Sequence, residues 1–260
     1  MNALADFTVF SFAHGGKERI VYRRGTGPAV VVMHEIPGIT PQVARFARYV
    51  ADAGMTVFMP NLFGVPGRPA TALYAAQQLA GACISREFHV LAGDRSSPIV
   101  DWLRALARRA FAELGGSGVG AVGMCLTGNF ALTMLLEPCV VAPVLSQPSL
   151  PFPITAGKAA AVHATPEAMA NARKRCAEER LKVVGLRFAG DPICPPARFR
   201  TLQRELGEGF EAIELADAAA NRRASKPAHC VLTLHLIDAD GEPTKAALEQ
   251  VLRFLRERLL

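Results

Sequence analysis

Several patterns that assign a function directly are missing from this 260-residue sequence. None of its six cysteines stands in a C-x-x-C pair, which excludes the common zinc and iron–sulfur spacings. Six cysteines are also few for this length, and they lack the spacing of a disulfide framework. The glycine-rich segments do not match a phosphate-binding loop, in which a lysine and then a serine or threonine follow the last glycine. We therefore expect neither a metal nor a cofactor.

Long apolar runs and a targeting segment are missing as well. No uninterrupted apolar stretch reaches the roughly 18 residues that span a bilayer. The first 13 residues lack the basic start and the apolar run of a signal peptide. Half of the residues are hydrophobic and a fifth are charged, which excludes a disordered chain. We expect a cytoplasmic protein without a membrane partner, whose cysteines stay reduced.

Aromatic side chains that stack on bases are scarce, since one Trp and three Tyr accompany 14 Phe. Lys and Arg outnumber Asp and Glu by 29 to 23, which gives a net charge of +6. The basic residues are scattered, and groups such as Arg104, Arg108 and Arg109 have the spacing of a solvated helix face. Without aromatic interleaving, this charge does not form a nucleic-acid patch, and we expect no nucleic-acid partner.

What the sequence does contain is a regular alternation of apolar runs and helical patterns. Two segments alternate like half-exposed strands, at 7–13 and 19–23, around a Gly15-Gly16 turn. Continuous apolar runs predict strands buried on both faces, at 29–33, 55–60, 119–124, 140–145, 183–189 and 210–215. Helices are predicted over 41–53, 96–114, 128–136 and 243–259.

This alternation predicts an α/β fold, with about eight mostly parallel strands and helices on both faces of the sheet. We expect a single domain over residues 1–260, with residues 62–93 as a partial lid. Ligand sites in such sheets lie at the carboxyl ends of the strands. Residues that directly follow the buried runs are therefore the candidates for chemistry.

The most informative strand end is the segment GMCLTG at 123–128, which follows one buried run and opens an apolar helical pattern. It has the form of a nucleophile elbow with Cys125 at the position of the nucleophile. A strained strand-to-helix turn needs small neighbours, and Gly123 and Gly128 provide them. The start of a helix also favours a thiolate and supplies an N–H group to an oxyanion. The alternative is a cysteine that only packs in the core.

An acid and a histidine follow later strands. Asp191 comes after the run at 183–189, and His229 lies in the loop after the last apolar strand. The order nucleophile, acid, histidine is the order of α/β-hydrolases. Two rivals remain at this stage: Asp217 as the acid and His235 as the base. Cys230, beside His229, is expected to point away from the site.

The strand at 29–33 is followed directly by HEIPG. A glutamate at the mouth of a buried strand, here Glu35, is costly unless it is paired. This loop supplies the second oxyanion donor in such folds, and we assign that role to the backbone N–H of Ile36, since Pro37 has none.

The chain resembles the dienelactone hydrolases, which are cysteine members of the α/β-hydrolase fold. The resemblance runs from about Ala29 to the end of the chain. It rests on VMHEIPG at 32–38, FMPNLF at 58–63, GMCL at 123–126, Gly190-Asp191 and Ala228-His229. The most specific feature is a cysteine in the elbow together with a glutamate after the strand at 29–33.

This resemblance implies a triad of Cys125, His229 and Asp191, in which the cysteine forms an acyl-enzyme with a small ester or lactone. It implies that Glu35 holds the resting thiol, and that the N–H groups of Ile36 and Leu126 bind the oxyanion. Two positions depart from the family pattern: Thr127 replaces a glycine after the elbow, and Thr233 replaces an arginine that binds the substrate carboxylate.

Arg86 and Arg95, in the predicted lid, are candidates for binding an acidic substrate, or they are solvated surface residues. Two other functions stay open. One is a relative without catalysis that binds a small ligand in the same pocket. The other is a hydrolase of another ester or thioester class.

Overall fold

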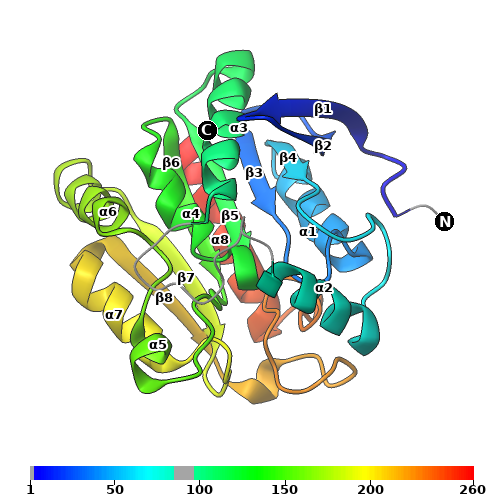
Figure 1. The fold of residues 1–260 in the computed structure, drawn as a ribbon, viewed down its shortest axis with the longest axis vertical. Coiled ribbons are helices and arrows are strands. Elements are labelled where there is room, and N and C mark those ends of the chain that lie inside the picture. Colours follow the sequence, from blue (N-terminus) through cyan, green and yellow to red (C-terminus); the bar gives the residue numbers. More distant parts are fainter. Residues whose placement is uncertain (1–2, 85–96) are drawn as a thin grey trace.

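The computed structural model describes residues 3–84 and 97–260, within which eight strands form one sheet in the order β1-β2-β4-β3-β5-β6-β7-β8 (Figure 1). Strands β3 to β8 pair in parallel, and β1 and β2 form a hairpin that joins β4 antiparallel. The strands are β1 (Thr8–His14), β2 (Lys17–Arg24), β3 (Ala29–Met33), β4 (Thr56–Pro60), β5 (Val119–Met124), β6 (Val140–Ser146), β7 (Val183–Phe188) and β8 (Phe210–Leu215). This sheet confirms the predicted α/β fold.

Burial along the strands explains their places in the sheet. Every residue of β3, β4, β5 and β7 is buried, as expected for strands covered on both faces. Strands β1 and β2 are largely exposed and form one edge of the sheet. The continuous apolar runs of the sequence therefore correspond to interior strands, with one exception. The run at 210–215, predicted to be buried on both faces, is β8 at the other edge of the sheet, and only two of its six residues are buried.

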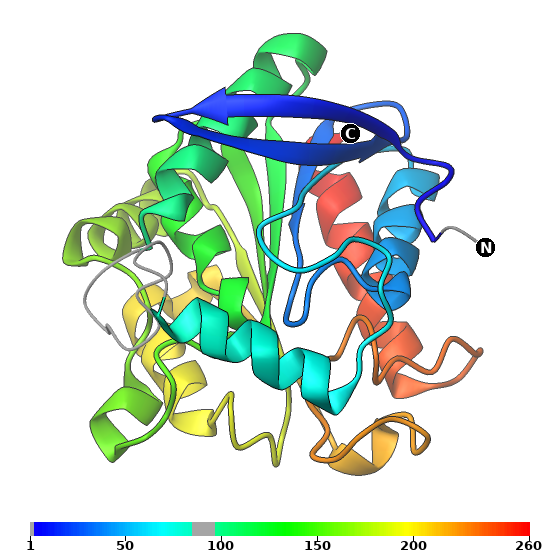
Figure 2. The same ribbon diagram turned by 45° about the vertical axis from the view of Figure 1, so that its right-hand side comes forward.

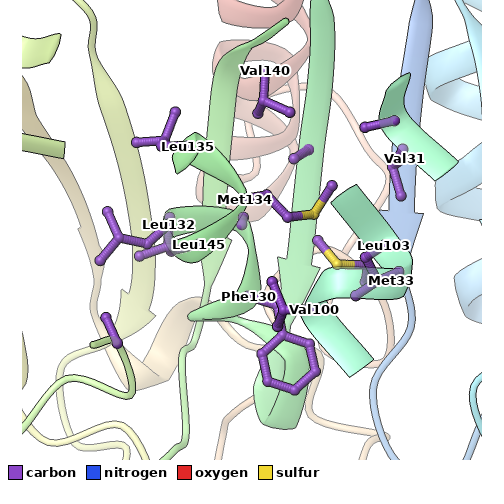
Figure 3. Packing of buried hydrophobic residues seen from close by; sticks show 14 of the residues in the cluster. Val31, Met33, Val100, Leu103, Phe130, Leu132, Met134, Leu135, Val140 and Leu145 are labelled. Carbon is purple, nitrogen blue, oxygen red and sulfur yellow. The ribbon is translucent and has the colours of Figure 1, made fainter. Parts of the chain in front are cut away.

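Helices cover both faces of this sheet (Figures 1 and 2). Residues of α1 and α8 pack in one core cluster, and residues of α3, α4, α6 and α7 pack in the other. Figure 3 shows the second cluster, where Val100, Leu103 and Phe130 lie against Val31 and Met33 of β3. The helices are α1 (Pro41–Asp52), α2 (Ala72–Ile84), α3 (Ile99–Leu114), α4 (Phe130–Thr133), α5 (Ala156–Ala160), α6 (Pro166–Glu178), α7 (Pro196–Leu206) and α8 (Pro243–Leu259).

Helix α1 illustrates how the sequence specifies these elements. The Oγ1 of Thr40 accepts a hydrogen bond from the Val43 N–H (3.3 Å) and caps the helix, and Pro41 occupies its first turn. Val43, Ala47 and Val50 recur at helical spacing and are buried against the sheet. The helix predicted over 41–53 is observed almost in full.

Two predicted helices differ from the observed ones. The segment predicted as a helix over 128–136 contains only the four-residue α4, between 3₁₀ turns at Cys125–Thr127 and Met134–Leu136. The helix predicted over 96–114 begins at Ile99 in the structure. The first difference matters for the site, because the elbow leads into a single 3₁₀ turn rather than into a long helix.

Candidate active site

Cys125 directly follows β5 and has a φ of +54°, in the left-handed region that residues other than glycine rarely occupy. Its glycine neighbours make this turn possible. A Cβ on Gly123 would lie 2.2 Å from the carbonyl oxygen of Thr127, and one on Gly128 would lie 2.5 Å from the Cα of Pro148. The turn therefore excludes side chains at both positions and raises Cys125, which is half-buried, into a cavity.

Thr127, the residue that departs from the glycine of the family pattern, joins the elbow to the neighbouring strand. Its side chain is fully buried, and its Oγ1 accepts a hydrogen bond from the Met124 N–H (2.9 Å). The same hydroxyl lies 3.0 Å from the carbonyl oxygen of Met33, at the end of β3. The hydroxyl thus links the carboxyl ends of β3 and β5, and this departure has a structural role.

His229 and Asp191 form a short buried pair. The Nδ1 of His229 lies 2.6 Å from the Oδ2 of Asp191, whose side chain is completely buried. The other oxygen of Asp191 accepts hydrogen bonds from the backbone N–H groups of Ile193 (2.9 Å) and Cys194 (3.3 Å). Asp191 is therefore fixed by the loop after β7, and it fixes the imidazole in turn.

The imidazole of His229 also lies beside the Cys125 side chain. Burial opposes the charged imidazolium, but the neighbouring Cys125 thiolate and the hydrogen bond to Asp191 outweigh it, so the pKa of His229 lies well above its ordinary value. Ser149 Oγ lies 3.5 Å from Cys125 Sγ and 3.5 Å from His229 Nε2. The structure thus brings Cys125, His229 and Asp191 together in one chain of contacts.

The two rivals have other partners. Asp217 accepts a hydrogen bond from the Gly190 N–H (2.9 Å) rather than binding the imidazole. His235 accepts backbone N–H groups of the His229 loop at Nδ1 and lies 2.7 Å from the Ser225 carbonyl oxygen at Nε2. Burial lowers the pKa of His235, which agrees with a neutral ring that braces the loop.

Glu35 has partners other than the Cys125 thiol. Its Oε2 accepts a hydrogen bond from Gln147 Nε2 (2.9 Å), and its Oε1 accepts one from the Thr233 hydroxyl. Burial is the main cause that raises the pKa of Cys230, and the Glu35 carboxylate is the next largest. Among the described residues, Glu35 makes no hydrogen bond to Cys125, so the contact implied by the resemblance is not made in this conformation.

Three residues of the site are missed by the sequence analysis. The hydroxyl of Ser149 lies 3.5 Å from both the Cys125 thiol and the His229 imidazole. Gln147 has a φ of +34°, and its side-chain amide contacts both the Glu35 carboxylate and the Val231 N–H (3.3 Å). Both follow β6, so the strand-end rule that identified Asp191 also applies to them. Cys230, which we expect to point away, lines the cavity with Cys125. Adjacent residues of a turn can face one hollow, unlike adjacent residues of a strand.

A cavity of about 500 Å³ opens over Cys125 and His229. Ile36 lies on its wall, and Leu126 is in the first turn after the elbow. One side is formed by α2, which both views place near the carboxyl ends of β3 and β5 (Figures 1 and 2). Arg86 and Arg95 lie outside the described residues.

No group of three or more His, Cys, Asp or Glu side chains that could hold a metal ion occurs in the described ranges. None of the described helices combines the length and the apolar character needed to cross a membrane.

Comparison with known proteins gives a family match and a fold. The model of the dienelactone hydrolase family matches residues 19–165. A putative dienelactone hydrolase from Klebsiella pneumoniae superposes with a TM-score of 0.62 at 17% identity, over 96% of this chain and 98% of that one. A dienelactone hydrolase-like promiscuous phosphotriesterase from metagenomic libraries gives 0.61 at 17% identity, over 98% of both chains.

A lidless α/β serine hydrolase from Xanthomonas campestris gives a TM-score of 0.57 at 12% identity, over 98% of this chain and 96% of that one. No individually curated protein sequence matches the chain. These similarities establish the α/β-hydrolase fold.

Proposed function

Because the chain belongs to the dienelactone hydrolase family, we propose that it hydrolyses small carboxylic esters or lactones through an acyl-cysteine intermediate. Cys125 is the nucleophile, His229 the acid and base, and Asp191 the residue that orients the imidazole. The observation that carries this proposal is the buried 2.6 Å contact between His229 and Asp191, beside a cysteine held at φ +54°. Such strain persists where the surrounding structure enforces it, and this occurs mainly at functional sites.

The reaction follows from these positions. The Cys125 thiolate attacks the carbonyl carbon, a C–S bond forms, and the carbonyl electrons move to the oxygen. The N–H groups of Ile36 and Leu126 stabilise this oxyanion. When the carbonyl re-forms, the C–O bond breaks and the leaving oxygen takes the proton from His229 Nε2. Water then attacks the acyl-cysteine and gives a proton to His229, which releases the acid and restores the thiolate.

The two departures from the family pattern do not disturb this triad. The hydroxyl of Thr127 links two strand ends, and that of Thr233 binds Glu35. Threonine is uncharged, and the hydroxyl of Thr233 is bonded to the Glu35 carboxylate. This position therefore offers no cation to the carboxylate of a dienelactone. We therefore place the substrate among esters or lactones in general rather than dienelactone in particular.

A panel of activated esters and lactones, including dienelactone, tests this proposal with the native protein and the Cys125→Ala variant. We expect turnover of some members and a loss of about a thousandfold or more in the variant. Equal turnover by both proteins would show that Cys125 is not the nucleophile. Binding without turnover of any member would favour a ligand-binding protein.

A further inference from the structure

We propose, resting on the function above, that the preferred substrates are esters or thioesters with an apolar acyl group and an anionic leaving group. The basis is an asymmetry of the cavity over Cys125. One part of its lining is apolar and formed largely by α2, and another part is the loop before His229, which carries Arg223 and Lys226.

The apolar wall is a stripe of small side chains. Ala72, Ala75, Ala76 and Leu79 recur at positions i, i+3, i+4 and i+7 of α2 and all line the cavity. Phe152 lines it as well. The alanine methyl groups, the Leu79 side chain and the Phe152 ring surround an apolar space, which suits an unbranched acyl chain without charged groups.

The cationic wall has no opposing acid. Among the described residues that line this cavity, none is Asp or Glu. Arg223 and Lys226 are both exposed, and neither has an ion pair within the described part of the chain. Asp217 borders a neighbouring hollow that Lys226 shares, but it is engaged by the Gly190 N–H. Two unpaired cations at a cavity mouth attract an anion, and salt weakens this attraction.

The chemistry of the triad decides which part of the substrate meets these cations. His229 gives its proton to the leaving atom, so the leaving group must lie on the His229 side. The loop 223–227 runs directly into His229 and lines the cavity on the same side. Contact between His235 Nε2 and the Ser225 carbonyl oxygen (2.7 Å) holds the middle of this loop in place. The leaving group therefore departs past Arg223 and Lys226, and the acyl group rests against α2.

Matched esters test this assignment. The first pair is the hexanoyl ester of hydroxynitrobenzoate and the same ester with its carboxylate capped as a methyl ester. The second pair places the charge on the acyl side: the mono-nitrophenyl ester of adipate against nitrophenyl hexanoate. Each kcat/KM is divided by the spontaneous hydrolysis rate of the same ester, which removes differences in leaving-group reactivity. We expect about a tenfold preference for the anionic leaving group at low salt, mainly in KM, and none for the anionic acyl group.

The variants locate the preference. In Arg223→Ala/Lys226→Ala we expect the preference to fall to about one, with turnover of the capped ester retained. Arg222→Ala, an exposed neighbour that does not line this cavity, removes one charge as a control and should keep the preference. Equal rates on the first pair in the native protein, or an unchanged preference in the double variant, would overturn the assignment. Loss of the preference in Arg222→Ala would also overturn it, since the effect would then be one of overall charge. No turnover of any ester would instead overturn the proposed function and, with it, this inference.

Discussion

At the scale of single residues, the side chain that controls the proton of His229 is Asp191. It is buried, two backbone N–H groups hold its Oδ1, and its Oδ2 lies 2.6 Å from Nδ1 of the imidazole. In the proposed mechanism, this arrangement keeps the proton on Nδ1 in the neutral ring and leaves Nε2 free to exchange protons with Cys125 and the substrate. The sequence offers Asp217 as a rival, and only the geometry separates the two.

We predict that Asp191→Asn lowers kcat for an activated ester by roughly a thousandfold to ten-thousandfold, because the amide favours the wrong tautomer of His229. Asp217→Asn is the matched control, and we expect it to cost less than about tenfold, since the Asp217 carboxylate accepts a hydrogen bond from the Gly190 N–H instead of binding the imidazole. Steady-state kinetics on both variants checks this. A larger loss in Asp217→Asn than in Asp191→Asn would contradict the assignment.

At the scale of elements, the elbow between β5 and α4 depends on a buried hydroxyl. Thr127 satisfies the Met124 N–H and lies against the end of β3. Replacing the hydroxyl by a methyl group of similar volume leaves a buried N–H without a partner, which costs about 1–3 kcal/mol.

We therefore predict that Thr127→Val lowers the free energy of unfolding by about 1–3 kcal/mol in urea titrations. Thr8→Val is the control, because Thr8 is an exposed residue of the edge strand β1 and its hydroxyl contacts only the Arg23 carbonyl among the described hydrogen bonds. Its loss should change stability by less than about 0.5 kcal/mol. Equal stability of the native protein and Thr127→Val would show that the hydroxyl is not needed to hold the elbow.

The elements differ in how well their sequences predict them. Strands β5 and β8 and helix α8 have the predicted bounds, because their apolar residues recur regularly and a glycine or proline marks the start of each. Helix α6 contains few apolar residues, so its periodicity is weak. Helix α7 begins at Pro196, directly after Pro195, and a pair of prolines in a sequence favours a turn, although proline in the first turn of a helix costs no hydrogen bond.

At the scale of the whole molecule, the parallel sheet explains why the convergence of these three candidate residues could be predicted. Cys125, Asp191 and His229 lie far apart in the chain, but they follow the parallel strands β5, β7 and β8, and the carboxyl ends of these strands lie along one edge of the sheet. Strand order along the sequence therefore predicts this convergence. The partners of Glu35 and the charges of the loop 223–227 depend on how long loops fold over that edge, which no periodic pattern specifies.

The stability of the whole molecule should depend on His34. This side chain is fully buried at the end of β3, and burial lowers its pKa to about 4 from an ordinary value of 6.5. The folded protein thus binds fewer protons at His34 than the unfolded chain. The stabilisation is complete above about pH 6.5 and is lost as the pH falls towards 4, by roughly 3 kcal/mol.

We predict that the unfolding free energy of the native protein falls more steeply between pH 7 and pH 4 than that of His34→Gln, by roughly 3 kcal/mol. Urea titrations at several pH values measure both slopes. The difference between the slopes isolates His34, because the other titrating groups are shared. Parallel slopes for the two proteins would contradict a neutral buried imidazole.

The most direct test of the central claim is to trap the acyl-enzyme. Nitrophenyl pivalate has a hindered acyl group that slows the second half of the reaction, and an acid quench followed by intact mass and peptide mapping identifies the modified residue. The account predicts one pivaloyl group per chain, on Cys125, formed in step with nitrophenol release and missing in Cys125→Ala. Nitrophenol release by the native protein with no pivaloyl group on Cys125, or with the group on Cys230 or Ser149 instead, would contradict it.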